Sequence, residues 1–177
     1  MADFEIIAEG TLSSGATTIS LTGIPQTYSH LEFQLSARGS YASAYPSAAN
    51  YQFNGDTGTN YGGAHGHVNS GTPGAEGYEL GANSSVYYGN VVALDSWTAN
   101  IQGVTNWFVP NYTSTSFAKQ VFTTQTLTDA NSIYTIRFGS GGWNDTSAIT
   151  SITILDNSGV GTYEIMAQSS YWLAGWA

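Results

Sequence analysis

Few side chains in this sequence could carry out chemistry, because the chain has three histidines and no cysteine. His65 and His67 have the one spacing that is typical of a metal site. Two residues apart on an extended segment, both imidazoles lie on the same side, as a zinc or nickel ion requires. Two histidines supply only half of such a site, and Glu76 or Asp56 could complete it only through the folding of the chain around them. The alternative, a Gly-His segment that holds no metal or other cofactor, is the one we expect.

The segment Asn54-Gly55-Asp56-Thr57-Gly58-Thr59-Asn60 is rich in oxygen-bearing side chains and superficially resembles a calcium-binding loop. The EF-hand spacing, which ends in a bidentate glutamate, is missing. Gly, Asn and Asp are also the residues that form turns. We therefore interpret this segment as a plain turn, with a calcium site as the alternative.

Hydrolysis has little support in the sequence. A glycosidase needs two carboxylates that face each other across the sugar bond, and the closest pair here is Glu76 and Glu79. On a strand their odd spacing sends the two side chains to opposite faces. No serine lies in the Gly-x-Ser-x-Gly pattern of a nucleophile elbow. His30 falls on the polar side of its predicted strand, which favours a surface or interface residue over a base. We therefore predict that the protein is not an enzyme.

The five tryptophans are the other chemical resource of the chain. Exposed aromatic rings can stack on sugars, whereas buried rings supply packing energy. Trp107 and Trp143 lie beside strand-breaking residues and are the best candidates for a carbohydrate platform. Tyr171, Trp172 and Trp176 lie among apolar neighbours near the end of the sequence, which is typical of packing or of contact between subunits.

The low charge of the chain restricts its partners. Charged residues make up 8% of the sequence, with a formal net charge of -9, whereas about 25% is usual. Three Lys and Arg residues cannot neutralise several phosphates, so nucleic acid and anionic membrane surfaces are poor partners. We see no secretion signal and no apolar run near the ~20 residues that cross a bilayer. We expect a soluble protein made in a cytoplasm, whose neutral surface serves hydration or close packing against identical neighbours.

The elements that position these residues are β-strands. Apolar and polar residues alternate from Leu31 to Arg38, which predicts a strand with one face of each kind. The same period recurs near Tyr134, Ile136 and Phe138, which alternate with polar residues. Further strands are predicted at 19–21, 152–154 and 163–167, and weaker ones at 4–12, 51–54, 86–93, 101–109 and 117–126. No apolar period of a helix runs over three turns, so we expect no substantial helices.

Clusters of turn residues separate these strands, at 13–15, 54–58, 139–142 and 156–159, the last as a hairpin loop. Residues 57–75 form the longest stretch without a strand pattern, and we expect an irregular loop there that makes contacts. About eight to ten short strands without helices predict an all-β fold. We expect an antiparallel, jelly-roll-like β-sandwich in a single domain over residues 1–177, with a closed barrel as the alternative.

Several segments, taken in order, carry a resemblance to a known family. The first half has Ile24-Pro25-Gln26-Thr27-Tyr28-Ser29-His30-Leu31-Glu32-Phe33, Ser36-Ala37-Arg38, Phe53-Asn54-Gly55-Asp56 and Asn60-Tyr61. The second half has Val109-Pro110-Asn111-Tyr112, Phe117-Ala118-Lys119, Trp143, residues 148–154 and Ser169-Ser170-Tyr171-Trp172-Leu173-Ala174-Gly175. Over nearly the whole chain this set resembles jelly-roll-like proteins on the outside of tailed bacteriophages. The closing segment departs from that family, which usually has a Gly-Ser-x-x-Ser-Leu-Tyr-Gly-like stretch there.

The resemblance implies a structural role and no catalytic residues. We expect a virion protein on the exterior of a tailed-phage particle, assembled in the host cytoplasm, and most readily a head decoration (cement) or head-fibre protein. Its partners would be the major capsid protein, other virion proteins and copies of itself, as a homotrimer. We expect the contacts to come from residues 57–75, the loop at Trp143 and the segment from Tyr171 to Trp176. The alternative is a carbohydrate- or receptor-binding module of a tail fibre, with a host glycan as ligand.

Overall fold

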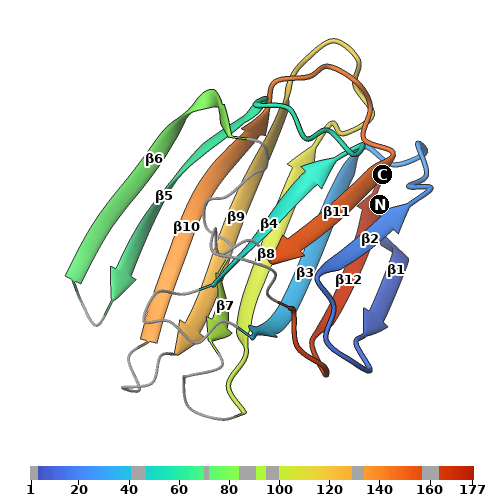
Figure 1. The fold of residues 1–177 in the computed structure, drawn as a ribbon. Helices are drawn as coiled ribbons and strands as arrows, with labels where there is room; N and C mark the ends of the chain where they lie inside the picture. Colours follow the sequence, from blue (N-terminus) through green and yellow to red (C-terminus); the bar gives the residue numbers. More distant parts are fainter. Residues whose placement is uncertain are drawn as a thin grey trace.

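The computed structural model describes residues 4–40, 47–69, 72–83, 91–94, 100–128, 134–156 and 164–177. Over these residues the chain forms twelve strands and no helix (Figure 1), so none of its described elements is a helix that could span a membrane. The strands are β1 (Phe4–Thr11), β2 (Thr18–Thr22), β3 (His30–Gly39), β4 (Ser47–Phe53), β5 (Tyr61–Asn69), β6 (Thr72–Asn83), β7 (Val91–Leu94), β8 (Gly103–Pro110), β9 (Lys119–Thr128), β10 (Tyr134–Trp143), β11 (Ser151–Asp156) and β12 (Ser170–Trp176).

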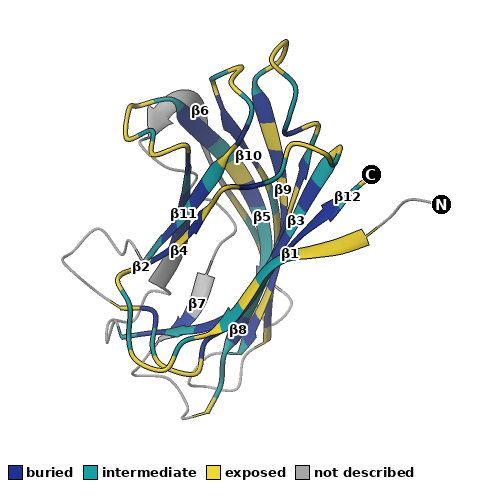
Figure 2. Ribbon diagram, turned by 90° about the vertical axis from the view of Figure 1, so that its right-hand side faces the viewer, coloured by how far each residue is buried: buried dark blue, intermediate teal, exposed yellow. Residues whose placement is uncertain are grey.

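The strands form two layers. Eight of them make one large sheet of antiparallel neighbours, in the order β1-β12-β3-β8-β9-β10-β5-β6. Three others make a small antiparallel sheet in the order β2-β11-β4. The short β7 links the two sheets, because it pairs in parallel with the end of β3 and antiparallel with β4. Figure 2 shows the two sheets facing each other, and the predicted all-β, antiparallel sandwich is confirmed.

The core lies where the small sheet covers the large one. In β3 every second side chain from Leu31 to Ala37 is buried, as the alternation of the sequence predicts. Aromatic rings fill the centre: the ring of Trp107 lies 3.8 Å from that of Tyr51 and 4.6 Å from that of Phe33, between centroids. Burying a large apolar side chain of this kind stabilises the fold by about 1.5–3 kcal/mol.

Residues 57–75 are not an irregular loop, which corrects the expectation from the sequence. Most of them belong to an antiparallel hairpin formed by β5 and β6. The pattern was hidden because small and polar residues take the positions where strands usually carry apolar ones. The glycines have a steric reason: a Cβ on Gly63 would lie 2.7 Å from the carbonyl oxygen of Ser140 on β10. Glycine at this position therefore allows β5 and β10 to pair.

Two other expectations change in the same way. The run at 139–142 is part of β10 and not a turn, and a Cβ on Gly139 would lie 2.6 Å from the carbonyl oxygen of Ala64. The strand predicted at 163–167 is wrong for its described residues, since Ile165 forms only isolated bridges to Ala16 and Gly39. Most of the strand predicted at 86–93 and of the turn predicted at 156–159 lies outside the described residues.

Candidate functional site

The half of the large sheet that contains β10, β5 and β6 extends beyond the small sheet (Figure 1). Its two faces differ in character. We call the face on the side of the small sheet the inner face, and the opposite one the outer face. The inner face carries His65, His67, Thr123, Gln125 and Arg137, and the outer face carries exposed apolar side chains.

The inner face of this half is polar where a sandwich core would be aliphatic. His65 and Gln125 are buried, and His67 and Arg137 are partly buried. The strand register places Gln125 opposite Arg137, and Arg137 opposite His67. The side-chain nitrogen of Gln125 donates a 2.8 Å hydrogen bond to the hydroxyl of Thr105 on β8. The result is a row of hydrogen-bonding groups that crosses four neighbouring strands.

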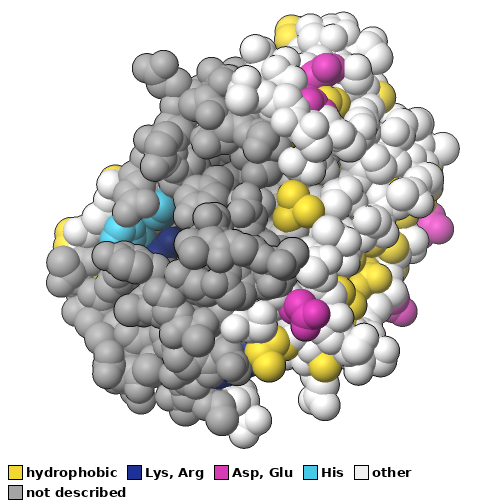
Figure 3. Space-filling model, viewed as in Figure 1, with side chains coloured by type: hydrophobic (Ala, Val, Ile, Leu, Met, Phe, Trp, Pro, Cys, Tyr) yellow, Lys and Arg dark blue, Asp and Glu magenta, His cyan; other side chains and the backbone are white. Residues whose placement is uncertain are grey.

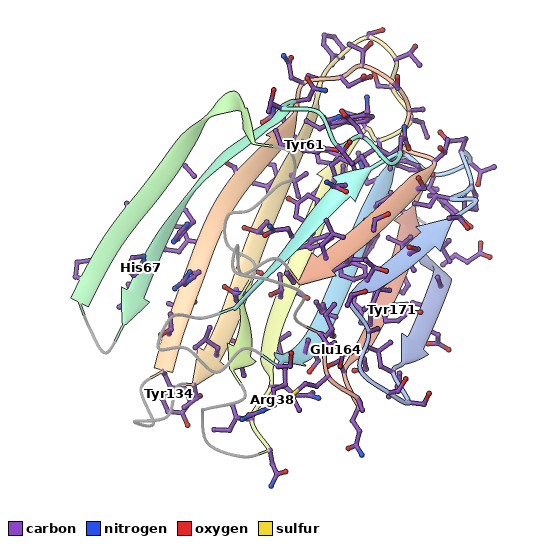
Figure 4. All side chains as sticks on the ribbon, viewed as in Figure 1. Arg38, Tyr61, His67, Tyr134, Glu164 and Tyr171 are labelled. Carbon is purple, nitrogen blue, oxygen red and sulfur yellow. The ribbon has the colours of Figure 1, made fainter. Side chains whose placement is uncertain are left out.

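His65 and His67 lie on the same face of β5, as the spacing predicts, with ring centroids 5.6 Å apart. Gly74 on β6 makes room for the ring of His67, because a Cβ there would lie 2.5 Å from Nε2. Figure 4 labels His67, and Figure 3 shows histidine atoms next to Lys or Arg atoms on the β5 side of the molecule. Among the described side chains, no third His, Asp or Glu completes a metal-binding cluster.

The outer face carries five exposed large apolar side chains, which we call the outer patch: Phe108, Phe122, Tyr134, Ile136 and Phe138. Phe108 on β8 is directly opposite Phe122 on β9, and Phe138 on β10 lies diagonally across from Phe122. Tyr134 is 79% exposed, and the exposed fractions of the other four lie between 36% and 59%.

The outer patch has one carboxylate at its margin, Glu32 on β3, which is the register partner of Phe108, and its surroundings on β5, β8, β9 and β10 are uncharged. A groove of about 770 Å³ runs beside Phe122 and Phe138, with Ala64, Gly66 and Ala75 among its lining residues. The ring of Phe138 lies over Gly66, since a Cβ there would be 2.9 Å from a ring carbon. In the described residues of β5, β8, β9 and β10, this face holds no Asp, Glu, Lys or Arg; its polar side chains are Asn106, Gln120, Thr124, Thr126, Thr128 and Ser140.

Strand β10 has its apolar side chains on the face that points away from the core. Tyr134, Ile136 and Phe138 are exposed, whereas Thr135 is 8% exposed and faces inward. Trp143 at the end of the same strand explains this orientation. It is 2% exposed, and residues at odd positions of the strand share its face. The sequence interpretation missed the outer patch for this reason. The signal that could have found it is the odd spacing of five residues between Phe138 and Trp143, which puts the two side chains on opposite faces of a strand.

The turn predicted at 54–60 is confirmed. Asn54 and Gly55 both have positive φ, 53° and 70°, and the backbone nitrogen of Asp56 donates to the carbonyl of Phe53 at 2.9 Å. Positive φ at both central residues defines a type I′ turn, for which Asn-Gly is the preferred pair. The Asn54 side-chain oxygen accepts hydrogen bonds from the backbone nitrogens of Thr150 and Ser151, which ties the turn to the start of β11.

The Asp56 carboxylate, a calcium ligand in the alternative interpretation, is engaged by donors of the protein. It accepts hydrogen bonds from the indole of Trp143 at 2.7 Å and from Asn60 and the Gly58 backbone at 2.8 Å. The bond from Trp143, followed by that from Asn60, holds the pKa of Asp56 below its usual value. A calcium ion would have to displace these donors, so the arrangement favours the turn.

Trp107 and Trp143 are buried, which corrects the expectation that either presents a ring to a sugar. Trp107 is 1% exposed. Trp143 packs against Phe53 at 5.6 Å and stacks on Tyr61 at 6.3 Å, between ring centroids. Burial raises the pKa of the Tyr61 hydroxyl, which lies in this cluster. Both tryptophans therefore serve packing and are not available to a ligand in the folded chain.

The closing segment is strand β12, which lies inside the large sheet between β1 and β3. Tyr171 is partly buried, with its ring 6.4 Å from that of Phe33. A segment with strands on both sides has its backbone hydrogen bonds already made. Only its side chains could contact a partner.

Trp172 and Trp176 lie on the outer side of β12 and are partly exposed. Their indole nitrogens donate to the side chains of Gln34 at 3.1 Å and Glu32 at 3.0 Å, respectively. Phe4 packs against Trp176 at 4.9 Å between centroids. The structure thus shows that Trp172 and Trp176 make contacts within the chain. The predicted contact of these two tryptophans with another subunit stays a prediction.

Three candidates from the sequence remain: His30, which lies near the surface, and Glu76 and Glu79. Nδ1 of His30 accepts a hydrogen bond from the backbone of Asn111, and its ring lies 5.5 Å from Phe108 at the margin of the outer patch. Glu76 and Glu79 both belong to β6, and their side chains lie outside the described residues.

Comparison with known proteins finds no matching family model, no matching curated protein and no matching solved structure. The class of the protein is therefore given by its own fold, an antiparallel β-sandwich with one oversized sheet.

Proposed function

We propose that this chain is a non-catalytic structural protein on the exterior of a tailed-phage particle, and that its copies associate through the outer patch. The observation that carries the proposal is the exposure of five large apolar side chains on one face of the large sheet. Soluble monomers rarely expose contiguous apolar surface of this kind unless it binds something.

The size of the outer patch fits association between copies. Aromatic side chains present about 150–250 Å² each when fully exposed, so the five residues together expose on the order of 500 Å². A stable interface buries about 800 Å² from each partner. The outer patch with its rim of Thr, Ser, Gln and Asn supplies an area of this size.

The charge distribution supports a second copy of this chain as the occupant. Two chains with a net charge of -9 repel each other over most of their surfaces. The described part of the outer face around Phe122 and Phe138 carries no charged side chain, and the Glu32 carboxylate lies at the margin beside Phe108. Two copies can therefore meet around Phe122 and Phe138 without bringing carboxylates together. Sheets pack face to face about 10 Å apart through such side chains.

The place in a virion rests on the resemblance of the sequence to exterior phage proteins. On that basis the chain is a head decoration or head-fibre protein that binds the major capsid protein and assembles as a trimer. The alternative, a carbohydrate-binding module of a tail fibre, has less support, because Trp107 and Trp143 are buried and cannot form its platform.

Sedimentation velocity of the purified chain at micromolar concentration tests association. We expect an oligomer, and we expect the double substitution Phe122→Ser with Phe138→Ser to convert it to a monomer with an unchanged circular dichroism spectrum. The matched control is Phe117→Ser, because Phe117 is also exposed, at 74%, but lies in the loop between β8 and β9. A wild-type monomer, or an oligomer that survives the double substitution, would contradict the proposed contact.

Binding to capsids tests the virion assignment separately. We expect the chain to co-sediment with purified capsids of the phage whose genome carries the gene, and the gene to lie beside the major capsid gene. A position among tail-fibre genes, with hits on a glycan array, would favour the receptor-binding alternative.

A further inference from the structure

A groove with a largely polar lining lies over strands β1, β12 and β3, at the other end of the large sheet from the β5–β6 hairpin (Figure 1). Its volume of about 440 Å³ falls within the range of roughly 300–1,000 Å³ that is usual for small-molecule sites. The residues that line it on the outer face are one tryptophan and four polar residues: Trp172, Glu9, Thr11, Gln34 and Ser170. An aromatic ring with a few polar groups around it is the composition of a site that orients a ligand.

Trp172 lies at the centre of this lining and is held in place by the protein. Its direct register partners are Glu9 on β1 and Gln34 on β3. Its indole nitrogen donates to the side chain of Gln34 at 3.1 Å, and Gln34 in turn donates to the side chain of Asn106 on β8 at 2.8 Å. Phe4 packs nearly perpendicular to the indole, with ring centroids 6.0 Å apart. A ring that is fixed in advance loses little freedom when a ligand stacks on it.

The polar side chains around Trp172 have hydrogen-bonding groups that the fold does not use. The amide of Gln34 spends one N–H and one lone pair in the two bonds above, so it keeps one of each. The side chains of Glu9, Thr11 and Ser170 make no hydrogen bond to the part of the chain that the structure describes. A carboxylate only accepts, whereas a hydroxyl both donates and accepts. Donors and acceptors therefore stand side by side around one aromatic ring.

We propose that this groove binds a neutral oligosaccharide. A pyranose ring has C–H groups on its faces, which stack on an aromatic ring, and hydroxyls on its rim, which need donors and acceptors together. Trp172 supplies the ring, and Glu9, Gln34, Thr11 and Ser170 bond to the hydroxyls. Glu9 is the one charged residue among the described residues that line the groove, and the chain has a net charge of -9. An acidic sugar would be repelled, so the ligand is an uncharged one.

The groove is separate from the outer patch. Phe122 and Phe138, at the centre of that patch, lie on β9 and β10, and β8 separates these strands from β3. The inference therefore does not rest on association between copies. The double substitution Phe122→Ser with Phe138→Ser should leave sugar binding intact, so this test and that of the outer patch fail independently.

Calorimetric titration of the full chain with neutral oligosaccharides tests the proposal. The probes are the hexasaccharides of maltose, laminarin, xylan and chitin type, with oligogalacturonate as the acidic probe. We expect at least one neutral probe to bind and the acidic one not to bind. Trp172→Ala should lower the affinity by about tenfold or more. Glu9→Gln and Thr11→Val, which leave the packing of the indole intact, should each lower it severalfold.

The matched control is Trp176→Ala. Trp176 lies on the same side of β12, is also partly exposed and is also hydrogen-bonded through its indole, but it does not line the groove. This variant should bind sugar as the wild type does. Trp172→Phe, which keeps an aromatic ring, should retain more affinity than Trp172→Ala. Circular dichroism of each variant checks that it folds.

Three results would overturn the proposal. The first is a titration in which no neutral probe binds. The second is an affinity that Trp172→Ala and Glu9→Gln leave unchanged, or that Trp176→Ala lowers as much as Trp172→Ala. The third is binding of tetramethylammonium that depends on Trp172, in a chain that binds no sugar, because an aromatic ring beside a carboxylate would then serve a cation.

Discussion

The indole nitrogen of Trp143 donates a 2.7 Å hydrogen bond to the carboxylate of Asp56, and this contact joins the end of β10 to the turn that follows β4. It therefore connects the large sheet to the small one at the edge of the core. The ring of Trp143 is buried, and its one polar atom is satisfied by a carboxylate held in a tight turn.

Removing the Asp56 carboxylate should destabilise the fold. Asp56→Ala leaves three donors without their acceptor, on Trp143, Asn60 and Gly58. We expect the free energy of unfolding to fall by about 1–3 kcal/mol, measured by urea denaturation. Glu9→Ala is the control, because Glu9 is exposed on β1. An equal effect of the two substitutions would mean that the contact contributes nothing.

The same carboxylate predicts acid sensitivity. The pKa of Asp56 is lowered in the folded chain, chiefly by Trp143, and that of Asp145 is lowered by hydrogen bonds from Ser147. A lowered folded pKa gives stability that is fully present above the unfolded pKa, near 3.9, and is lost as the pH falls through the folded value. Urea midpoints should therefore drop below about pH 4. The drop should be smaller in Asp56→Ala, and an identical pH profile in the variant would exclude this role of Asp56.

The buried Lys119 is predicted to hold two loops together. Its ammonium group donates to the carbonyl oxygens of Ser114, Phe117 and Thr146 at 2.7, 3.0 and 3.0 Å, and burial lowers its pKa. Lys119→Met fills similar space but leaves these carbonyls without their donor. We expect a loss of at least about 2 kcal/mol in the free energy of unfolding. The exposed neighbour Gln120, changed to Ala, should cost much less.

Gly139 is predicted to set the approach of β5 to β10. Gly139→Ala puts a methyl group 2.6 Å from the carbonyl oxygen of Ala64, which is backbone and cannot rotate away. Overpacking of this kind lowers the free energy of unfolding by about 1–3 kcal/mol. The measurement is the midpoint of thermal or urea unfolding, which should fall. Ser140→Ala is the adjacent control, since Ser140 is exposed on the outer face. A variant as stable as the wild type would show that the two strands can separate at no cost.

The elements that the sequence predicted best are those whose buried and exposed faces differ in polarity. In β3 and β11 the apolar residues alternate with polar ones, and the structure buries the apolar set in both. Period-2 burial is a local property, so a single strand reveals it. The Asn54-Gly55 turn was equally predictable from the sequence, because it needs positive φ at both residues and few residue types adopt that conformation.

The candidate surfaces were less predictable, because they depend on pairing between distant segments. The hairpin of β5 and β6 has few apolar residues of its own, and only its pairing with β10 identifies it as strand. In β10 the apolar set alternates clearly, but which face it occupies depends on Trp143, which packs against Phe53 and bonds to Asp56.

The amino-acid sequence by itself determined that this chain is built from alternating strands and tight turns, because side-chain alternation and turn preferences act over a few residues. Only the tertiary structure decided which face of each strand is covered. The small sheet covers one part of the large sheet and meets β5 at its first residue, Tyr61, whose hydroxyl accepts a hydrogen bond from the backbone of Phe53 on β4. The rest of β5 and β6 extends beyond it. Burial is a property of the neighbours that a side chain meets and not of the side chain alone. That is why Phe122 and Phe138 are exposed while His65 and Lys119 are buried.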